Sequence, residues 1–438
     1  MRRRKRIAVT RVALRLGLGM ALLASTSVPV RADDYHDSLE RLVGEHKRVA
    51  AARADHGGAE SAAAKAGSAW FPDLTATASA GHQRVALNND ATPTSMHTRE
   101  LTFGLRQTLW DFGAINSAIE KAEIGVRLSS VTLSQVSRDL LLEGITAYIN
   151  LERARRSLGY AENSVANIAK QTGMEESRVE LGGGFSSDVL QAKSQLAGAE
   201  AKLSRSKGMM ANAVNRFRAV FGRHPIDDDP QQKIPVPFDL LPGSLEDAVS
   251  LGRKHNTQLE ILRLTAESSR AEIDRVRAAE LGPNIHAIAQ RKFDRNPDGL
   301  AADRVQNIIK VELTYQFNTG LGAFHAIDSA QHALVSAEAK YAEVYDIVEE
   351  QVRNAWSNLA SAQDTARHLE NQMRISGEFL RLAREERLQG RRSLIDVLSG
   401  ETSLINAQSD AASADADVSI AAFTVLRATG LLDLTMVR

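Results

Sequence analysis

The chain has 438 residues, with 54 basic and 54 acidic side chains and no cysteine. Residues 1–32 hold eight of the basic side chains and no acidic one, so the remainder carries 46 (54 minus 8) basic groups against 54 acidic groups. This mildly acidic balance argues against a nucleic-acid partner. A chain without cysteine has neither disulfides nor the lipidated N-terminal cysteine of a lipoprotein.

The N-terminal segment, residues 1–32, predicts a secretory signal peptide. A basic segment from Arg2 to Arg6 precedes an apolar run from Val12 to Ala24, and the small-residue cleavage site ends at Ala32. The alternative is a membrane anchor, but the run is broken by Arg15 and is shorter than the ~20 residues that a spanning helix needs. We therefore expect export of a chain that begins at Asp33.

Two segments of the first half, about residues 74–82 and 98–109, predict β-strands. Leu101, Phe103 and Leu105 alternate with polar residues, and a period of two gives a strand one apolar and one polar face. The polar segment between the two strands suits an exposed loop.

A proline-free stretch from Asn116 to Leu181 follows and predicts a helix of unusual length, on the order of 100 Å at ~1.5 Å per residue. It ends at Gly182-Gly183-Gly184-Phe185, which suits a tight turn between antiparallel helices. A phosphate-binding loop is the alternative, but the downstream Gly-Lys-Ser/Thr is missing and no strand precedes the glycines.

Five prolines fall within residues 223–243, which we interpret as a joint between two halves. The second half, residues 244–432, repeats the order of the first half, residues 33–222. It has expected strands at about 285–293 and 305–317, a proline-free stretch at 321–388 and a turn at Gly390-Arg391-Arg392-Ser393-Leu394. Asp188-Val189-Leu190 recurs as Asp396-Val397-Leu398, at the same offset that separates Gly222 from Gly430, so the chain is predicted to be a tandem duplication.

The expected strands indicate a membrane β-barrel. Strands of about ten residues with an apolar face, in an exported chain, are typical of outer-membrane barrels, but four strands cannot close one because small barrels need about eight. The chain must then form oligomers, or the strands are a soluble hairpin capping a helical bundle. The residues expected to face lipid are Leu101, Phe103, Leu105, Ile309, Val311, Leu313 and Tyr315.

Catalytic motifs are lacking. The histidines are scattered without zinc-site spacing, and no Gly-x-Ser-x-Gly or cysteine nucleophile occurs. Asp227-Asp228-Asp229 suits a solvated loop better than a metal site. We expect no enzymatic activity, no cofactor and no metal.

Phe71-Pro72-x-Leu74, Gln107-x-Leu109-Trp110-Asp111-x-Gly113 and above all residues 390–398 resemble the TolC-like outer-membrane factors. The resemblance covers about residues 38–432. It implies an α+β membrane protein: a homotrimer in which each protomer gives four strands to a twelve-stranded barrel in the outer-membrane lipid. Long helices would continue as a periplasmic tunnel, and residues 223–243 with the C-terminus would form an equatorial belt.

The resemblance also implies a gate. Asp396 matches the aspartate that constricts the tunnel, where a threefold carboxylate ring would attract cations. A second family aspartate is Ser399 here. Arg392 matches an arginine that ties the closed state to the pair Ser187-Asp188, and a family tyrosine of this link is Arg387 here. Alternatively, Asp188 and Asp396 cap or begin helices, where carboxylates are favoured anyway.

In the family, the turns receive a periplasmic adaptor. The docking residues would be Gly182, Gly183, Gly184, Phe185, Gly390, Arg391, Ser393 and Leu394. The function implied is the exit duct of a type I secretion system with an inner-membrane ABC transporter, because residues 178–201 look most like members that export large adhesins or agglutinins. One alternative is the duct of a drug or small-molecule efflux pump, which could use an RND transporter. A more distant alternative is a periplasmic coiled-coil adaptor.

Overall fold

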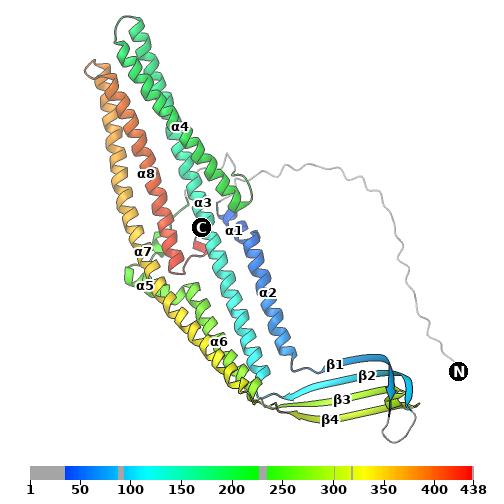
Figure 1. Ribbon diagram of the computed structural model, residues 1–438. Helices are drawn as coiled ribbons and strands as arrows, with labels where there is room; N and C mark the ends of the chain where they lie inside the picture. Colours follow the sequence, from blue (N-terminus) through cyan, green and yellow to red (C-terminus); the bar gives the residue numbers. More distant parts are fainter. Residues whose placement is uncertain (1–34, 87–92, 226–233, 300, 317–318, 437–438) are drawn as a thin grey trace, which may run out of the picture.

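The computed structural model describes residues 35–86, 93–225, 234–299, 301–316 and 319–436. The expected signal peptide, Asp227-Asp228-Asp229 and Phe317 lie outside these residues. The described chain forms one four-stranded sheet at one end of a bundle of long helices (Figure 1). The helices reach from the sheet to two hairpin tips at the far end (Figure 1).

The sheet is antiparallel, with strands in the order β1-β2-β3-β4. The strands are β1 (Asp73–Val85), β2 (Thr94–Trp110), β3 (Asn284–Arg295) and β4 (Asp303–Thr314). The first three extend beyond the expected ranges because polar residues beyond the apolar alternation still pair across the ladder, as Arg84 does with Ser95. β4 instead ends at Thr314, so Tyr315 lies just outside the sheet.

Two helices of 67 residues, α3 (Ala114–Glu180) and α7 (Gly322–Leu388), are the backbone of the bundle. Each packs against a shorter helix near the sheet, α2 (Lys47–Ser68) or α6 (Thr257–Leu281), and turns back at its far end into α4 (Ser186–Phe221) or α8 (Leu394–Ala428) (Figure 1). The offset from the start of α3 to the start of α7 equals that from α4 to α8, so both hairpins keep the spacing of the sequence repeat. No helix among the described residues combines the length and apolarity needed to cross a bilayer.

Polar and aromatic groups fix the junction between sheet and helices. The buried carboxylate of Asp111 accepts hydrogen bonds from the backbone N–H groups of Gly113 (3.1 Å) and Ile115 (2.5 Å), and so satisfies donors at the start of α3. Trp70 Nε1 donates to Asn116 Oδ1 at 3.1 Å. These bonds hold the end of β2 and the start of α3 in a fixed direction.

The largest apolar cluster lies near the middle of the bundle. It joins Leu39 of α1 (Tyr35–Glu45), Ile145 of α3 and Phe423 of α8 to Ile234 of the joint and Leu432 near the C-terminus. The second half places α5 (Leu245–His255) against α7, where Val249 packs on Val348 and Val352. Burial of residues so distant in sequence connects the two halves at mid-length.

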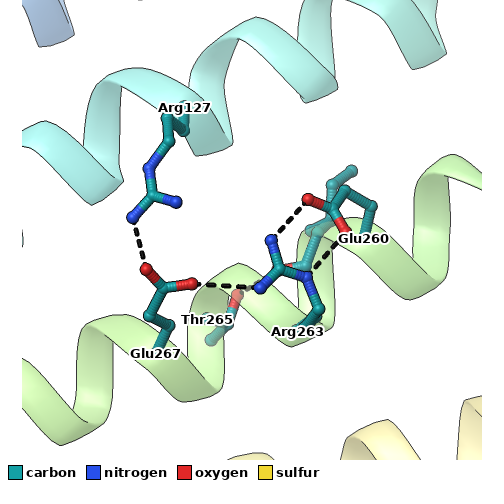
Figure 2. Close-up of polar contacts among 6 residues, drawn as sticks. Arg127, Glu260, Arg263, Thr265 and Glu267 are labelled. Atoms are coloured by element: carbon teal, nitrogen blue, oxygen red, sulfur yellow. Dashed lines mark hydrogen bonds and ion pairs between the residues drawn. The ribbon is translucent and has the colours of Figure 1, made fainter.

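Charged side chains connect α3 with α6 nearer the sheet. Arg127 of α3 pairs with Glu267 of α6, and Arg263 bridges Glu267 (3.1 Å) and Glu260 (2.7 Å) on α6 itself (Figure 2). Hydrogen bonds from Arg275 and Lys121 lower the pKa of Glu272 to about 2. These contacts stabilise the ionised carboxylates, so their contribution is present above the usual carboxyl pKa and is lost only as the pH falls towards 2.

Candidate functional site

The register of the sheet places the apolar side chains of all four strands on one face. Three cross-strand rows carry most of them: Leu74–Leu105–Ala289–Ile309, Ala76–Phe103–Arg291–Asn307 and Ala78–Leu101–Phe293–Val305. Val311 and Leu313 continue this face towards the helices. The side chains are exposed in the protomer, with Ile309 exposed by 89%. Such an apolar surface must be covered by another molecule.

The opposite face is polar and more sheltered. Ile288 and Gly104 are buried there, and a Cβ added at Gly104 would meet Thr75 Oγ1 at 2.8 Å. Three ion pairs lie on this face: Lys292 with Glu100 at 3.6 Å and Arg304 with Asp294 at 3.3 Å across strands, and Lys310 with Glu312 along β4. A polar face of this kind suits the interior of a barrel.

The two hairpin tips share one backbone conformation. Gly182 N–H donates to Val179 O and Gly183 N–H to Arg178 O, both at 2.9 Å. In the second tip the same bonds run from Gly390 to Arg387 and from Arg391 to Glu386, again at 2.9 Å. Gly182 and Gly390 adopt the positive φ angles that this helix end requires (80° and 73°).

Arg392 contacts its own hairpin. Its Nε lies 2.9 Å from Glu386 Oε2, and its guanidinium stacks over the Phe379 ring at 5.2 Å from the centroid. The expected bond to Ser187-Asp188 is not formed within one protomer, where Ser187 Oγ instead lies 3.5 Å from Asp188 Oδ1. A contact between protomers remains a proposal.

Arg387 forms a buried ion pair that links the two hairpins near their tips within the protomer. Its Nη2 lies 2.6 Å from Oε2 of Glu175, whose side chain is only 4% exposed, and its Nη1 donates to Arg392 O at 3.4 Å. Glu175 is part of α3, and Gly184 leaves room for it, because a Cβ there would approach Glu175 Oε1 to 3.2 Å. Glu175 was not predicted from the sequence. The one feature that sets it apart there is that the second repeat has an alanine, Ala383, at the equivalent position.

Asp396 and Ser399 lie in the first turns of α8 and are exposed in the protomer. Ser393, not Asp396, is the N-cap of α8, and its Oγ accepts the Asp396 N–H at 3.2 Å. Asp188 likewise lies in the first turn of α4, after the N-cap Phe185. Asp396 and Ser399 begin an exposed polar stripe along α8 that continues through Ser403, Asn406 and Asp410.

The residues expected to dock an adaptor differ in exposure. Gly182, Gly183, Gly184, Phe185, Gly390, Arg391 and Ser393 are exposed. Leu394 is not, because it packs with Ile168, Ala192 and Leu398 and is 2% exposed. Leu394 therefore supports the tip from inside the protomer.

An exposed apolar sheet face, a sheltered polar face and two very long helices that end in paired turns define a protomer of an outer-membrane channel. The model of the family "Outer membrane efflux protein" matches residues 39–223 and 248–431. The chain belongs to this family and is a TolC-like channel of the outer membrane, with its helical part in the periplasm. A channel of this family is a transport protein and not an enzyme.

Two relatives of known name match most of the chain. The outer membrane efflux protein BepC of Brucella suis is 23% identical over 383 residues, covering 83% of this chain and 78% of BepC. The outer membrane protein TolC of Escherichia coli is 22% identical over 372 residues, covering 79% of this chain and 71% of TolC.

Solved structures share the fold. VceC of Vibrio cholerae superposes with a TM-score of 0.77 at 18% identity, covering 90% of this chain and 96% of VceC. CmeC of Campylobacter jejuni superposes with a TM-score of 0.77 at 13% identity, covering 98% and 96% of the two chains. The four-stranded sheet and the duplicated helical hairpins are thus the protomer fold of the trimeric TolC-like channels.

Proposed function

We propose that this channel is the exit duct of a type I secretion system. It would export a large protein, such as an adhesin or agglutinin, together with a periplasmic adaptor and an inner-membrane ABC transporter. The observation that carries this choice is the run of residues 178–201 across the first tip, which resembles members with that role. Because this segment contains an exposed tip, it lies where a partner can select the channel.

Efflux of drugs or other small molecules is the second candidate. The Brucella suis relative BepC is named as an outer membrane efflux protein. Deletion of the gene in the source bacterium separates the two. Type I secretion predicts loss of one large exported protein with little change in drug susceptibility. Efflux predicts the reverse: increased susceptibility with the exported proteins unchanged.

The proposed barrel places the apolar sheet face against lipid and the polar face in the lumen of a twelve-stranded trimer. Val311→Arg on the apolar face should then impair assembly by about 2–4 kcal/mol if it lies near the bilayer midplane. The control is Lys310→Arg on the polar face, which keeps a positive charge beside Glu312 on the same strand. The yield of heat-modifiable trimer in outer-membrane fractions measures both. Equal tolerance of the two changes would contradict the orientation.

The proposed gate uses the tips. Three copies of Asp396 would form a carboxylate ring at the inner end of the tunnel, and Arg392, on release from Glu386, could reach Asp188 of a neighbouring protomer. Support comes from the position of both aspartates at the tips, where Asp396 is exposed and Asp188 is partly exposed. A ring of aspartates favours cations and binds multivalent ones.

Planar-bilayer recordings test the gate. Arg392→Ser should raise single-channel conductance, because a contact that holds the closed state is lost. Asp396→Ala should weaken cation selectivity and block by multivalent cations, whereas Ser399→Asp should strengthen that block. If all three variants form trimers with unchanged conductance and selectivity, these residues stabilise the ends of their helices and do not gate the channel. An adaptor pull-down with Phe185→Ala tests docking at the turns.

A further inference from the structure

The apolar face of the sheet ends in a band of arginines on its side away from the helices. Beyond the row that contains Leu101 and Phe293, the next row is Ala80–Arg99–Arg295–Asp303. His82 pairs with His97 in the row after that, and Arg84 with Ser95 in the last. Arg291 belongs to the same face, one row before Phe293, and its guanidinium stacks on the Phe293 ring at 5.1 Å from the centroid.

The height of this band follows from strand geometry. Eight steps from Ile285 to Phe293 cover ~26 Å along β3 at ~3.3 Å per residue. With the usual strand tilt of ~35–45°, this is ~20 Å of membrane thickness, close to the apolar band of ~25 Å in such barrels. Arg99 and Arg295 therefore lie at the level where acyl chains give way to headgroups. Arg291 can reach that level by extending its side chain outward.

The charges of this band are not balanced among the described residues. On the polar face, the two cations at comparable height, Lys292 and Arg304, each have a carboxylate partner. On the apolar face, Arg295 reaches Asp303 only at 3.8 Å. Among the described residues, the Arg99 side chain has no hydrogen bond or ion pair, and the Arg291 guanidinium stacks on Phe293 without a carboxylate partner. The three guanidinium groups thus have one described carboxylate among them, that of Asp303, and their excess positive charge favours an anion from outside the chain.

We propose that Arg99, Arg291 and Arg295 bind the phosphorylated headgroup of an anionic lipid in the outer leaflet. The guanidinium fork matches phosphate oxygens in pairs. The apolar row of Ala78, Leu101 and Phe293 lies directly below and accepts the acyl chains of the same molecule. This inference depends on the proposed lipid-facing orientation of the sheet. Each protomer presents one such site, at the tip of the barrel rather than at the gate.

Native mass spectrometry of the purified trimer, titrated with diphosphorylated lipid A, tests the proposal. The triple variant Arg99→Gln/Arg291→Gln/Arg295→Gln should bind this lipid at least tenfold more weakly. The matched control is Lys292→Gln/Arg304→Gln/Lys310→Gln, which removes the same number of cations from the polar face and should leave binding within twofold. Equal weakening in both triples would overturn the proposal, because general electrostatic attraction would then explain binding.

The ligand is tested in the same way. Lipid A without phosphates should bind the unmodified trimer as weakly as the diphosphorylated lipid binds the arginine triple. Inorganic phosphate should compete at least a hundredfold less well than the lipid. Undiminished binding of the dephosphorylated lipid, or equal competition by inorganic phosphate, would overturn a phosphorylated lipid as the ligand. If the triple fails to assemble, Arg99→Gln and Arg295→Gln alone should each weaken binding about threefold, and unchanged binding in both would contradict the site.

Failure of this inference can be distinguished from failure of the barrel orientation. The tryptophan fluorescence gained in Val311→Trp, on the apolar face, should be quenched by lipids brominated on their acyl chains. If the fluorescence is quenched but the arginine triple variant binds lipid A undiminished, the lipid-facing orientation is supported and the lipid site is contradicted. If the fluorescence is not quenched, both the orientation and the lipid site are contradicted.

Discussion

The two hairpin tips have the same backbone turn but differ in how far they bury the same motif. Leu398 of the second tip is fully buried, whereas Leu190, its equivalent in the first tip, is 68% exposed. Leu394 is buried and Ser186 takes its place in the first tip, while Phe185 is 75% exposed where the second tip has Ser393. The two repeats have therefore kept the same turn, but the second tip buries its apolar side chains within the protomer and the first tip exposes them.

The position of α8 explains this difference. Its first turns pack on α7 through Val397 and Leu380, and on α3 and α4 through Leu398, Ile168 and Ala192. Among the described residues of the protomer, the start of α4 has no comparable neighbour on its outer side. A closed ring of hairpins needs exposed apolar side chains of this kind, because each protomer must offer the next one a contact surface. The exposed Leu190 and Phe185 are thus available to a second protomer or to an adaptor.

The largest expected effect concerns the buried ion pair between the tips. Arg387→Ala would leave the buried Glu175 carboxylate with only the more distant Arg178, 4.0 Å away, and breaking a buried ion pair typically costs about 3–5 kcal/mol. We expect faster amide hydrogen exchange in residues 165–185 and a higher single-channel conductance, because the hairpins lose the buried ion pair that joins them near the tips. Exchange monitored by mass spectrometry on intact trimers measures the first effect.

Two further variants sharpen this comparison. Arg391→Ala removes an exposed arginine from the same turn and should change stability by less than about 0.5 kcal/mol. Glu175→Ala/Arg387→Leu gives the first repeat the alanine that the second has at Ala383, and should restore slow exchange because no buried charge remains. A double variant as labile as Arg387→Ala would show that unpaired charge is not the cause.

The second prediction uses the identical Asp-Val-Leu motifs. Leu398→Ala should destabilise its tip by about 2–5 kcal/mol, because a fully buried leucine leaves a cavity. Leu190→Ala should have little effect on the isolated protomer's packing, because its side chain is exposed. If both changes lower the trimer's melting temperature equally, Leu190 is buried between protomers. If Leu190→Ala instead weakens only adaptor binding, it belongs to the docking surface.

Local patterns were sufficient to predict the elements. The alternation of Leu101, Phe103 and Leu105 predicted one apolar sheet face, and the proline-free stretches predicted both long helices. The constant offset between the repeated motifs predicted equivalent turns. These features depend on residues close in sequence or on a repeated motif, so a single chain reveals them.

Contacts between the halves could not be predicted in the same way. Arg387 and Glu175 are 212 residues apart, and neither belongs to a repeated motif. The burial of Leu398 and the exposure of Leu190 follow from which helices surround them, because both end the same Asp-Val-Leu motif. Tyr315 was expected in a strand because apolar alternation continues past Thr314, although the ladder of β4 ends there.

The smallest expected effect concerns the helix caps. Ser393→Ala removes the oxygen that accepts the Asp396 N–H at 3.2 Å, and loss of such a cap typically costs about 1 kcal/mol. Phe185→Ser would place an equivalent oxygen before Asp188, whose N–H now reaches only the Phe185 carbonyl at 3.0 Å, and should stabilise α4 by a similar or smaller amount. Hydrogen exchange in the first turn of each helix measures both changes.

Adaptor affinity completes the test of the caps. Phe185→Ser should weaken adaptor binding while it stabilises its helix, because it removes an exposed aromatic ring from the docking turn. Ser393→Ala should weaken adaptor binding less than Phe185→Ser does, because it removes only one hydroxyl group from the second docking turn. If Phe185→Ser instead slows exchange and binds the adaptor as before, the first tip is exposed for contact with a neighbouring protomer, and the adaptor docks elsewhere.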